Sequence, residues 1–314
     1  MKQILFPTNR PGIAPGEQGA ALLAVLAMVV LLSGFASIGL SRLRATTDRV
    51  SDAEARSDTQ LLANAGTAAA VQMAGQVKAR ANRQPGALQQ PVTVPFSGGN
   101  VVVRFSDGGS CFNLNSLAPQ APGSGAAGSG SGSSQSRPQD FTRMLTAAGI
   151  PDLEAGAIAR ATAARLAATR SLWADPSEWT TVPGVTAAHW QAAGPLLCAL
   201  PNREASALNI NSLSAAQAPL LVSMGLGPDE ARRALANRPR EGWTSATDFW
   251  LEASPSGTPD TVGASVVGTT SRWMRVTLVA TTARARVSRE LLLDTLRQPA
   301  TVASSTWNTV EVGA

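Results

Sequence analysis

The side chains that most often perform chemistry in enzymes are scarce in this 314-residue chain. There is one histidine, His189, there is no tyrosine, and only 15% of the residues are charged. A nucleophilic serine needs a general base within hydrogen-bond reach, and a lone histidine is a poor source of one. The sequence has neither a P-loop nor a dinucleotide-binding glycine fingerprint. We therefore predict that the protein is not an enzyme.

Acidic residues that could bind a metal are dispersed along the chain. Asp152, Glu154, Asp175 and Glu178 are spread over a tryptophan-containing region predicted to be helical, and they do not form the Asp-rich loop that binds calcium. The glycine-rich tract 123–132 lacks the Lys-Ser/Thr ending of a phosphate-binding loop. We expect no cofactor, no metal and no small-molecule ligand.

The chain is basic, with a formal net charge of +5 and an isoelectric point near 10.4. Such a balance raises the question of nucleic acid or anionic lipid as a partner. The lysines and arginines are scattered, however, and no run of five or more occurs. This distribution favours a solvated surface rich in arginine.

The two cysteines, Cys111 and Cys198, could form one disulfide if this part of the chain lies in an oxidising compartment. The loop that such a bond closes is long, and the chain-entropy model gives about 4–5 kcal/mol for it. The alternative is two unrelated buried thiols. We favour the disulfide because the membrane topology inferred below favours export.

An uncharged stretch of 21 residues, from Ala20 to Leu40, is long enough to span the hydrocarbon core of a bilayer. Lys2 and Arg10 precede it and Arg42 and Arg44 follow it, so the charge bias does not settle its orientation. A cleaved secretory signal is the alternative, but its apolar region is normally about 7–15 residues long. We predict a membrane helix.

A short polar leader, residues 1–19, ends in Glu17-Gln18-Gly19, and the apolar stretch begins at once with Ala20. This order resembles the leader of a type IV prepilin, which a membrane peptidase cuts after the glycine on the cytoplasmic side. The resemblance implies processing between Gly19 and Ala20. It also implies that the apolar segment stays on the mature protein and that the bulk of the chain is exported.

The helix is expected to continue well beyond the membrane. No proline occurs from 41 to 82, and apolar residues recur at helical spacing between Leu61 and Met73. Gln84-Pro85-Gly86 would end it. We predict a stalk helix over 20–85, as in a pilin, and a plain anchor with a juxtamembrane helix is the alternative.

The exported part is predicted to be an α+β head. Val92–Val94 and Val101–Phe105 are predicted strands joined by a Ser97–Asn100 turn, and Cys111–Asn115 is a candidate third strand. Further strands are expected at Ala207–Leu213, Val262–Val267, Arg272–Ala280 and Arg284–Leu293, the last also compatible with a short helix.

These patterns divide the chain into consecutive regions. Long helix, antiparallel sheet and inserted helices together indicate an α+β, pilin-like fold whose helical domain is helix-hairpin-helix-like (SAM-like). After the stalk, the regions are a first β region at 86–122, a Gly/Ser linker at 123–138, an inserted helical domain at 139–205, a second helical unit with closing strands at 206–297, and a frayed tail at 298–314.

Two six-residue segments, Phe112–Leu117 and Leu208–Leu213, are near copies of one another. Their alternation places apolar residues on one face and asparagines on the other. Because asparagine is disfavoured in strands, we expect these side chains to satisfy backbone groups of loops at a strand end.

The segment Leu221–Ala231 has the pattern of a helix-hairpin-helix turn. Gly225 and Gly227 permit a tight turn between helices, and Ala231 permits close helix packing. Val182–Thr186 opens a second, looser copy.

In DNA-binding versions of this turn, backbone N–H groups hold phosphates. Here Asp229 and Glu230 stand beside the turn and would repel phosphate. We therefore favour a structural role without nucleic acid, and a DNA-binding or DNA-uptake protein is the alternative function.

Taken in order, these motifs resemble the minor pseudopilin K family of type II secretion systems. The resemblance extends from Gly16 to about Thr295. It is carried by Gly19–Leu26, Phe112–Leu117, Val182–Val185, Leu200-Pro201 and Leu208–Asn211.

The resemblance implies a subunit at the tip of a periplasmic pseudopilus that helps to initiate fibre assembly and protein export across the outer membrane. Its implied partners are the minor pseudopilins I and J, other pseudopilins, and the prepilin peptidase that processes it. Its implied location is the inner membrane, with a single span and the C-terminal head in the periplasm.

The sequence departs from the pilin and protein K patterns at two places. Most pilins carry a glutamate at the fifth mature position, where it is thought to pair with the N-terminal amine of a neighbour, and the matching residue here is Ala24. A subunit without that acid need not dock beneath another helix, which suits a tip. The Asp-rich segment of many family members is missing from Ala155–Arg170, so the calcium binding implied by the family is not expected here.

We expect the mature protein to begin at Ala20. Mass spectrometry of the protein purified from membranes of its native host should find a chain that lacks residues 1–19. An uncleaved N-terminus, or a cut after the apolar stretch, would contradict the pilin-type leader.

Overall fold

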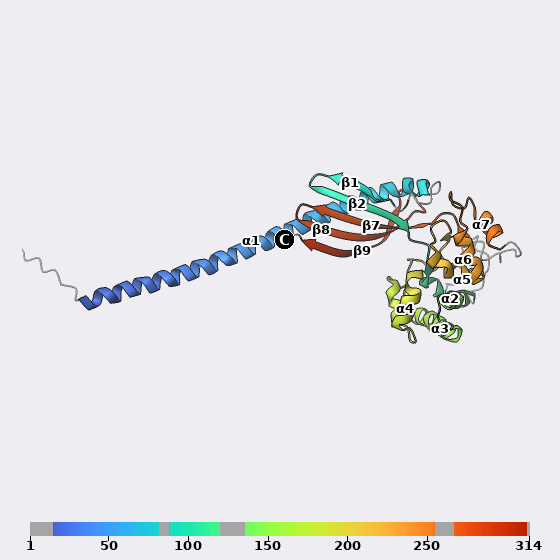
Figure 1. The fold of residues 1–314 in the computed structure, drawn as a ribbon, viewed down its shortest axis with the longest axis horizontal. Helices are drawn as coiled ribbons and strands as arrows, with labels where there is room; N and C mark the ends of the chain where they lie inside the picture. The colour runs from blue at the N-terminus through green and yellow to red at the C-terminus, as the bar shows by residue number, and fades with distance from the viewer. Residues whose placement is uncertain (1–14, 82–87, 89, 120–135, 255–266, 313–314) are drawn as a thin grey trace, which may run out of the picture. The chain divides into compact units, whose positions relative to one another are not determined.

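The computed structural model describes residues 15–81, 88, 90–119, 136–254 and 267–312 (Figure 1). The chain divides into two compact units, Met1–Ser57 and Asp58–Ala314. Helix α1 (Pro15–Ala81) has 67 residues and belongs to both units. The predicted long helix is therefore present, while its expected end at Gln84–Gly86 lies outside the described residues.

In the first unit, α1 carries the apolar stretch identified in the sequence. Its most apolar 18-residue window has a mean hydropathy of 2.4, which together with its length is enough to cross a membrane. Large apolar side chains from Leu22 to Leu40 are exposed. Because exposed apolar surface is unfavourable in water by about 25 cal/mol per Å², this helix fits a single-pass membrane anchor.

The second unit combines the end of α1 with an antiparallel sheet and a helical region (Figure 1). The sheet has the order β1-β2-β7-β8-β9, and each neighbouring pair is antiparallel. The strands are β1 (Val92–Phe96), β2 (Gly99–Asp107), β7 (Trp273–Thr282), β8 (Ala285–Asp294) and β9 (Thr301–Val312).

The helical region lies between β2 and β7 in the chain. Its helices are α2 (Ser136–Ala147), α3 (Asp152–Thr169), α4 (Ala187–Ala193), α5 (Ala218–Ser223), α6 (Pro228–Ala236) and α7 (Ala246–Ala253). Its short 3₁₀ helices are η2 (Leu114–Leu117), η3 (Pro176–Thr181), η4 (Gly194–Leu196) and η5 (Ala215–Gln217). Its short strands are β3 (Phe112–Asn113), β4 (Leu197–Cys198), β5 (Leu208–Asn209) and β6 (Val267–Gly268).

Strands β2 and β7 are neighbours in the sheet although the whole helical region separates them in sequence. Val103 lies opposite Leu278, and the pairing runs without a break from Gly99 to Asp107. The helical region is therefore an insertion between two adjacent strands. The predicted α+β fold with an antiparallel head and an inserted helical domain is confirmed.

From Asp58 onward, α1 packs on one face of the sheet. Its small residues Ala63, Ala70 and Ala74 are fully buried in a cluster with Val101, Val276 and other sheet residues. Gly66 belongs to the same stripe, and a Cβ placed on it would lie 2.7 Å from Cγ1 of Val101. The small side chains thus let the helix axis approach the sheet closely.

The helical region has its own, larger apolar core. Phe141, Trp179 and Phe249 are among its fully buried side chains. Phe141 stacks on Phe112 with ring centroids 4.8 Å apart, and it meets the ring of Trp179 edge-on. The insert is therefore a packed domain in its own right.

The frayed tail predicted at 298–314 is wrong. Residues Thr301–Val312 form strand β9, which pairs with β8 along the whole length of β8. The guanidinium of Arg289 on β8 lies 4.6 Å from the ring centroid of Trp307 and donates to Oγ of Ser305 at 2.9 Å. The register shifts twice along this pair, so the side-chain alternation that identifies a strand in sequence is interrupted.

Other expected boundaries also change. Helix α2 begins at Ser136, so the end of the linker expected at 123–138 is helical, and residues 123–135 lie outside the described part. Residues 285–294 form a strand rather than a helix. Of the strand expected at Val262–Val267, only Val267 is described, within β6. The hairpin of β1 and β2 turns where Ser97–Asn100 predicted it.

We expect Gly66→Leu to destabilise the head by about 1–2 kcal/mol. Overpacking against Val101 costs about 1–3 kcal/mol, and a gain in helix propensity of about 1 kcal/mol offsets part of it. Denaturant unfolding of the full-length protein in detergent measures the change. The control is Gln72→Leu at an exposed site of α1, which should shift stability by less than about 0.5 kcal/mol. Equal stability of the two variants would contradict close helix–sheet packing.

Candidate functional site

The described residues do not bring together a cluster of metal-binding side chains. Among them, no group of three or more His, Cys, Asp or Glu is placed to hold a metal ion. Nδ1 of His189 accepts from the backbone N–H of Thr186 at 3.1 Å, and its Nε2 lies 3.3 Å from Oε1 of Glu154. His189 therefore closes the first turn of α4 and ties it to α3.

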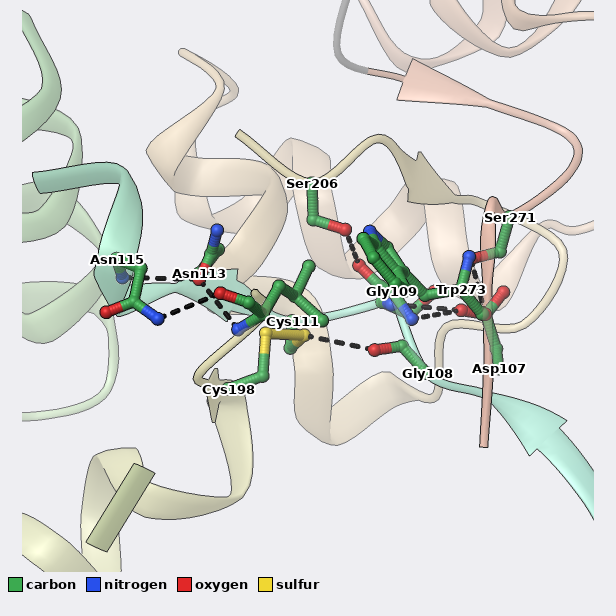
Figure 2. Close-up of a disulfide and its surroundings, with 12 residues drawn as sticks. Asp107, Gly108, Gly109, Cys111, Asn113, Asn115, Cys198, Ser206, Ser271 and Trp273 are labelled. Carbon is green, nitrogen blue, oxygen red and sulfur yellow. Dashed lines mark hydrogen bonds between the residues drawn. A yellow bond between two sulfur atoms is a disulfide. The ribbon is translucent and has the colours of Figure 1, made fainter. Parts of the chain in front are cut away.

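The site that the sequence motifs do converge on is the junction between the sheet and the helical insert (Figure 2). The chain leaves β2 at Asp107 and passes through Gly108, Gly109 and Ser110 to Cys111. It returns to the sheet at Trp273 on β7. The insert leaves and rejoins the stalk-bearing sheet in this region, so the bonds made here help to hold the insert on the sheet.

Asp107 organises the outgoing segment. Its Oδ1 accepts from the backbone N–H groups of Gly109 at 2.8 Å and Ser110 at 3.0 Å. Its Oδ2 accepts from Nδ2 of Asn209 at 2.9 Å and Oγ of Ser212 at 3.0 Å. One carboxylate at the end of β2 therefore holds both the start of the insert and a segment about 100 residues further along the chain.

Cys111 and Cys198, which are 87 residues apart in sequence, form a disulfide with their Cα atoms 5.8 Å apart (Figure 2). Both sulfur-bearing residues are buried. The bond joins the outgoing segment to β4, which pairs in parallel with β3. The disulfide that the sequence suggested is therefore present, and it joins the start of the insert to strand β4.

The first asparagine motif explains why strand β3 ends at Asn113. Asn115 is fully buried, and its Oδ1 accepts from the backbone N–H of Trp173 at 2.8 Å. Its Nδ2 donates to the backbone carbonyls of Trp173 at 2.9 Å and Leu200 at 2.8 Å. The chain turns into η2 to aim this side chain inward, so the strand expected at Cys111–Asn115 is reduced to Phe112–Asn113.

The second motif repeats this geometry. Oδ1 of Asn211 accepts from the backbone N–H of Trp243 at 2.7 Å, and its Nδ2 donates to the carbonyl of Trp243 at 3.0 Å. Oδ1 of Asn209 accepts from the N–H of Asn211 at 3.1 Å, as Oδ1 of Asn113 does from Asn115 at 3.2 Å. The strand expected at Ala207–Leu213 is likewise limited to Leu208–Asn209.

The insert therefore contains two copies of one structural unit. Each copy starts with a two-residue strand and an asparagine turn, continues through a pair of helices, reaches the tryptophan that the turn binds, and ends in a parallel partner strand. The strands β3 and β4 bound the first copy, and β5 and β6 bound the second. The repeated hexapeptide is visible in the sequence, but the tryptophans that its asparagines bind lie 58 and 32 residues away and are evident only in the structure.

The predicted hairpin lies between α5 and α6 in the second copy. Gly225 has φ of +102°, a conformation that glycine adopts without strain, and Ala231 is fully buried. The N–H of Gly227, at the start of α6, donates to Oε2 of Glu230 at 2.9 Å. A carboxylate of the chain itself thus occupies a backbone donor that a phosphate would need.

An arginine fixes the returning segment. Nε and Nη2 of Arg272 donate to the two carboxylate oxygens of Asp294 at 3.0 and 2.7 Å, and Nη1 reaches Glu204 at 3.3 Å. The hydrogen bonds from Arg272 lower the pKa of Asp294, and the same bonds raise the pKa of Arg272. The pair therefore favours both charged forms, and the contact of Arg272 with Glu204 links the sheet to the segment that follows β4.

The residues expected at the processing site and in the fibre core lie at the start of α1. Gly19, Ala20 and Ala24 are helical, and Ala20 and Ala24 are exposed. Nothing in the described structure acts on them, so cleavage after Gly19 stays a prediction.

Comparisons with known proteins agree with one another. The family model for "Type II secretion system (T2SS), protein K" matches residues 208–270, which include the second asparagine motif and the hairpin. The type II secretion system protein K of Aeromonas hydrophila is 30% identical over 182 residues, which are 49% of this chain and 54% of that protein. The chain thus spans about half the length of that relative.

Two further matches cover more of the chain. The type II secretion system protein K of Pectobacterium carotovorum subsp. carotovorum is 25% identical over 262 residues, 73% of this chain and 77% of that protein. A crystal structure of the GspK-GspI-GspJ complex from enterotoxigenic Escherichia coli contains a chain similar in fold. The TM-score is 0.65 at 21% identity, and the match covers 83% of this chain and 99% of that one.

We expect Asn115→Asp to destabilise the head by roughly 3 kcal/mol or more. The change keeps the side-chain shape but removes two donors, leaves two carbonyls unpaired and buries a carboxylate. Thermal or denaturant unfolding of the full-length protein measures the loss. Asn100→Asp, at an exposed position of β2, is the matched control and should be nearly neutral. A small effect at Asn115 would show that the asparagine turn does not hold the insert.

Proposed function

Because the chain belongs to the type II secretion system protein K family, we propose that it is a minor pseudopilin at the tip of the pseudopilus. In this role it helps to initiate fibre assembly and protein export across the outer membrane. It acts as a structural subunit and not as an enzyme.

The observation that carries this proposal is the insertion of a helical domain between two neighbouring strands of a pilin-like sheet. The matched chain of the GspK-GspI-GspJ complex is covered over 99% of its length, so the similarity includes the insert as well as the sheet. A bulky inserted domain in the head would obstruct subunits stacked above it in a fibre. Such a subunit fits best where nothing follows, which is the tip.

The proposed location is the inner membrane, with one span and the head in the periplasm. The apolar part of α1 supplies the span. The disulfide between Cys111 and Cys198 supports a head on the oxidising side of the membrane, because thiols in the cytosol are kept reduced.

Ala24 supports the terminal position. A charged glutamate in a fibre core needs a cationic partner, because an unpaired buried charge is costly. The chain has alanine at this position, so it needs no cationic partner from a subunit above it. Prepilin peptidase is the proposed processing enzyme, and other pseudopilins are the proposed neighbours in the fibre.

The alternative, a DNA-binding protein, has less support. Its hairpin turn has Glu230 bonded to the N–H of Gly227, and Asp229 beside it forms an ion pair with Arg232 at 2.6 Å. Both carboxylates lie where a phosphate would have to approach, and like charges repel.

We expect the full-length protein, co-expressed with the I and J homologues of its own secretion system, to purify with both in mild detergent. A chain truncated after residue 85 keeps the stalk helix without the head and is the control. Equal capture of I and J by both chains would place the contact in the stalk, and failure of the full-length chain to capture either would contradict the tip model. A gel-shift assay on the same preparation, at moderate salt, tests the DNA alternative.

A further inference from the structure

The two edges of the sheet differ in how they are protected from further strands. Edge strand β1 has five residues and contains Pro95, which has no N–H to donate. Edge strand β9 has twelve residues and contains neither proline nor lysine. Short length, proline and lysine are devices by which sheet edges avoid pairing with another chain, and β9 lacks all three.

Strand β9 is also accessible. Within the described part of the chain it pairs with β8 alone, so its outer row of backbone N–H and C=O groups faces away from the sheet. Every residue from Thr301 to Asn308 is exposed. Backbone groups of this kind are the template on which an extended segment adds a strand.

The two faces of β9 have different chemistry. Trp307 lies opposite Arg289, which donates to Oδ1 of Asn64 on α1 at 2.8 Å, and Val302 lies opposite the buried Leu293. Because opposite residues share a face, Trp307 and Val302 lie on the face that α1 packs against. They are nevertheless 42% and 44% exposed.

The other face of β9 is polar. Ser304 lies opposite Leu292 and Thr306 opposite Glu290, on the side away from α1. An incoming strand that matches β9 would therefore carry apolar side chains on the α1 face and small polar ones on the other. That alternation is typical of an antiparallel sheet with one buried face.

The central part of β9 already has a defined extended conformation. The register is regular from Ser304 to Trp307, and irregularities flank this run on both sides. Arg289 fixes the run through its contact with the Trp307 ring and its hydrogen bond to Ser305. An incoming strand would thus meet four residues whose conformation is already set, so little further ordering is required.

We propose that the β9 edge receives an extended, amphipathic strand from the head of a neighbouring pseudopilin, which continues the sheet beyond β9. This inference rests on the proposed function, because a pilin-like neighbour supplies a sheet with an alternating edge strand. Trp307 and Val302 would be covered by apolar side chains of the added strand. The contact joins heads side by side and is separate from the packing of the membrane helices.

The test uses full-length protein and the I and J homologues in detergent. The variant Ser304→Lys/Thr306→Lys places two lysines on the polar face of the edge, where the second of them can pair with Glu290 of the folded head. Lysines on an edge strand oppose the addition of a further strand, so we expect the affinity for the partners to fall at least about tenfold. The matched control is Thr93→Lys, an exposed position on the β1 edge, which should leave the affinity unchanged.

Hydrogen exchange of the wild-type complex gives a readout that does not depend on any variant. Those amides of residues 303–308 that point away from β8 should exchange at least about tenfold more slowly in the complex than in the free protein, while those of β1 keep their rates. A complex that forms with unchanged exchange in β9, or one that the double lysine variant forms as tightly as wild type, overturns this inference and leaves the proposed function standing.

Two other outcomes have distinct meanings. If wild-type protein forms no complex with I or J, the proposed function fails and this inference fails with it. If the free protein self-associates in detergent and the double lysine variant does not, β9 pairs with a second copy of this chain, and the heterologous partner proposed here is wrong.

Discussion

The constraint on which the rest of the head depends is that the chain must leave the sheet after β2 and return to the neighbouring strand β7. A domain of more than a hundred residues lies between two strands that are directly hydrogen-bonded to one another. Two segments of the chain join this domain to the sheet, and without further bonds they would act as a hinge. The carboxylate of Asp107, which accepts from Asn209 and Ser212, and the guanidinium of Arg272, which reaches Glu204, cross-link the insert to the sheet and oppose that motion.

The two copies within the insert are closed in the same way. In each copy an asparagine, fully buried in the first and half-buried in the second, binds both the N–H and the C=O of a distant tryptophan, as a backbone partner in a sheet would. A buried amide is costly unless it is fully bonded, so this arrangement tolerates little displacement. The two copies differ in their further bonds: the first adds a disulfide, and the second adds Arg238, which donates to the carbonyls of Asn211 and Leu213.

This rigidity bears on the proposed position at a fibre tip. A head that contacts neighbouring heads transmits force to its stalk helix only if the junction does not bend. Within the head, small residues on α1 permit close packing on the sheet, and Arg289 extends the contact outward to β9 through Asn64 and Trp307. The sheet, its stalk segment and its open edge thus form one connected body.

The sequence alone determined the features that depend on neighbouring residues. The uncharged stretch, the α1 periodicity, the β1–β2 turn and the hairpin at Gly225 are local patterns, and the structure places each where it was expected. The resemblance to protein K followed from their order. Tertiary structure decided the rest. The partners of Asn115 and Asn211 lie 58 and 32 residues away, so local alternation misidentified both motifs as longer strands. Strand β9 was missed because its bulges break the alternation, and its stability comes from β8, which no local pattern in residues 301–312 reveals. Long-range pairing depends on which segments the fold brings together, and this is why the roles of those residues became evident only in three dimensions.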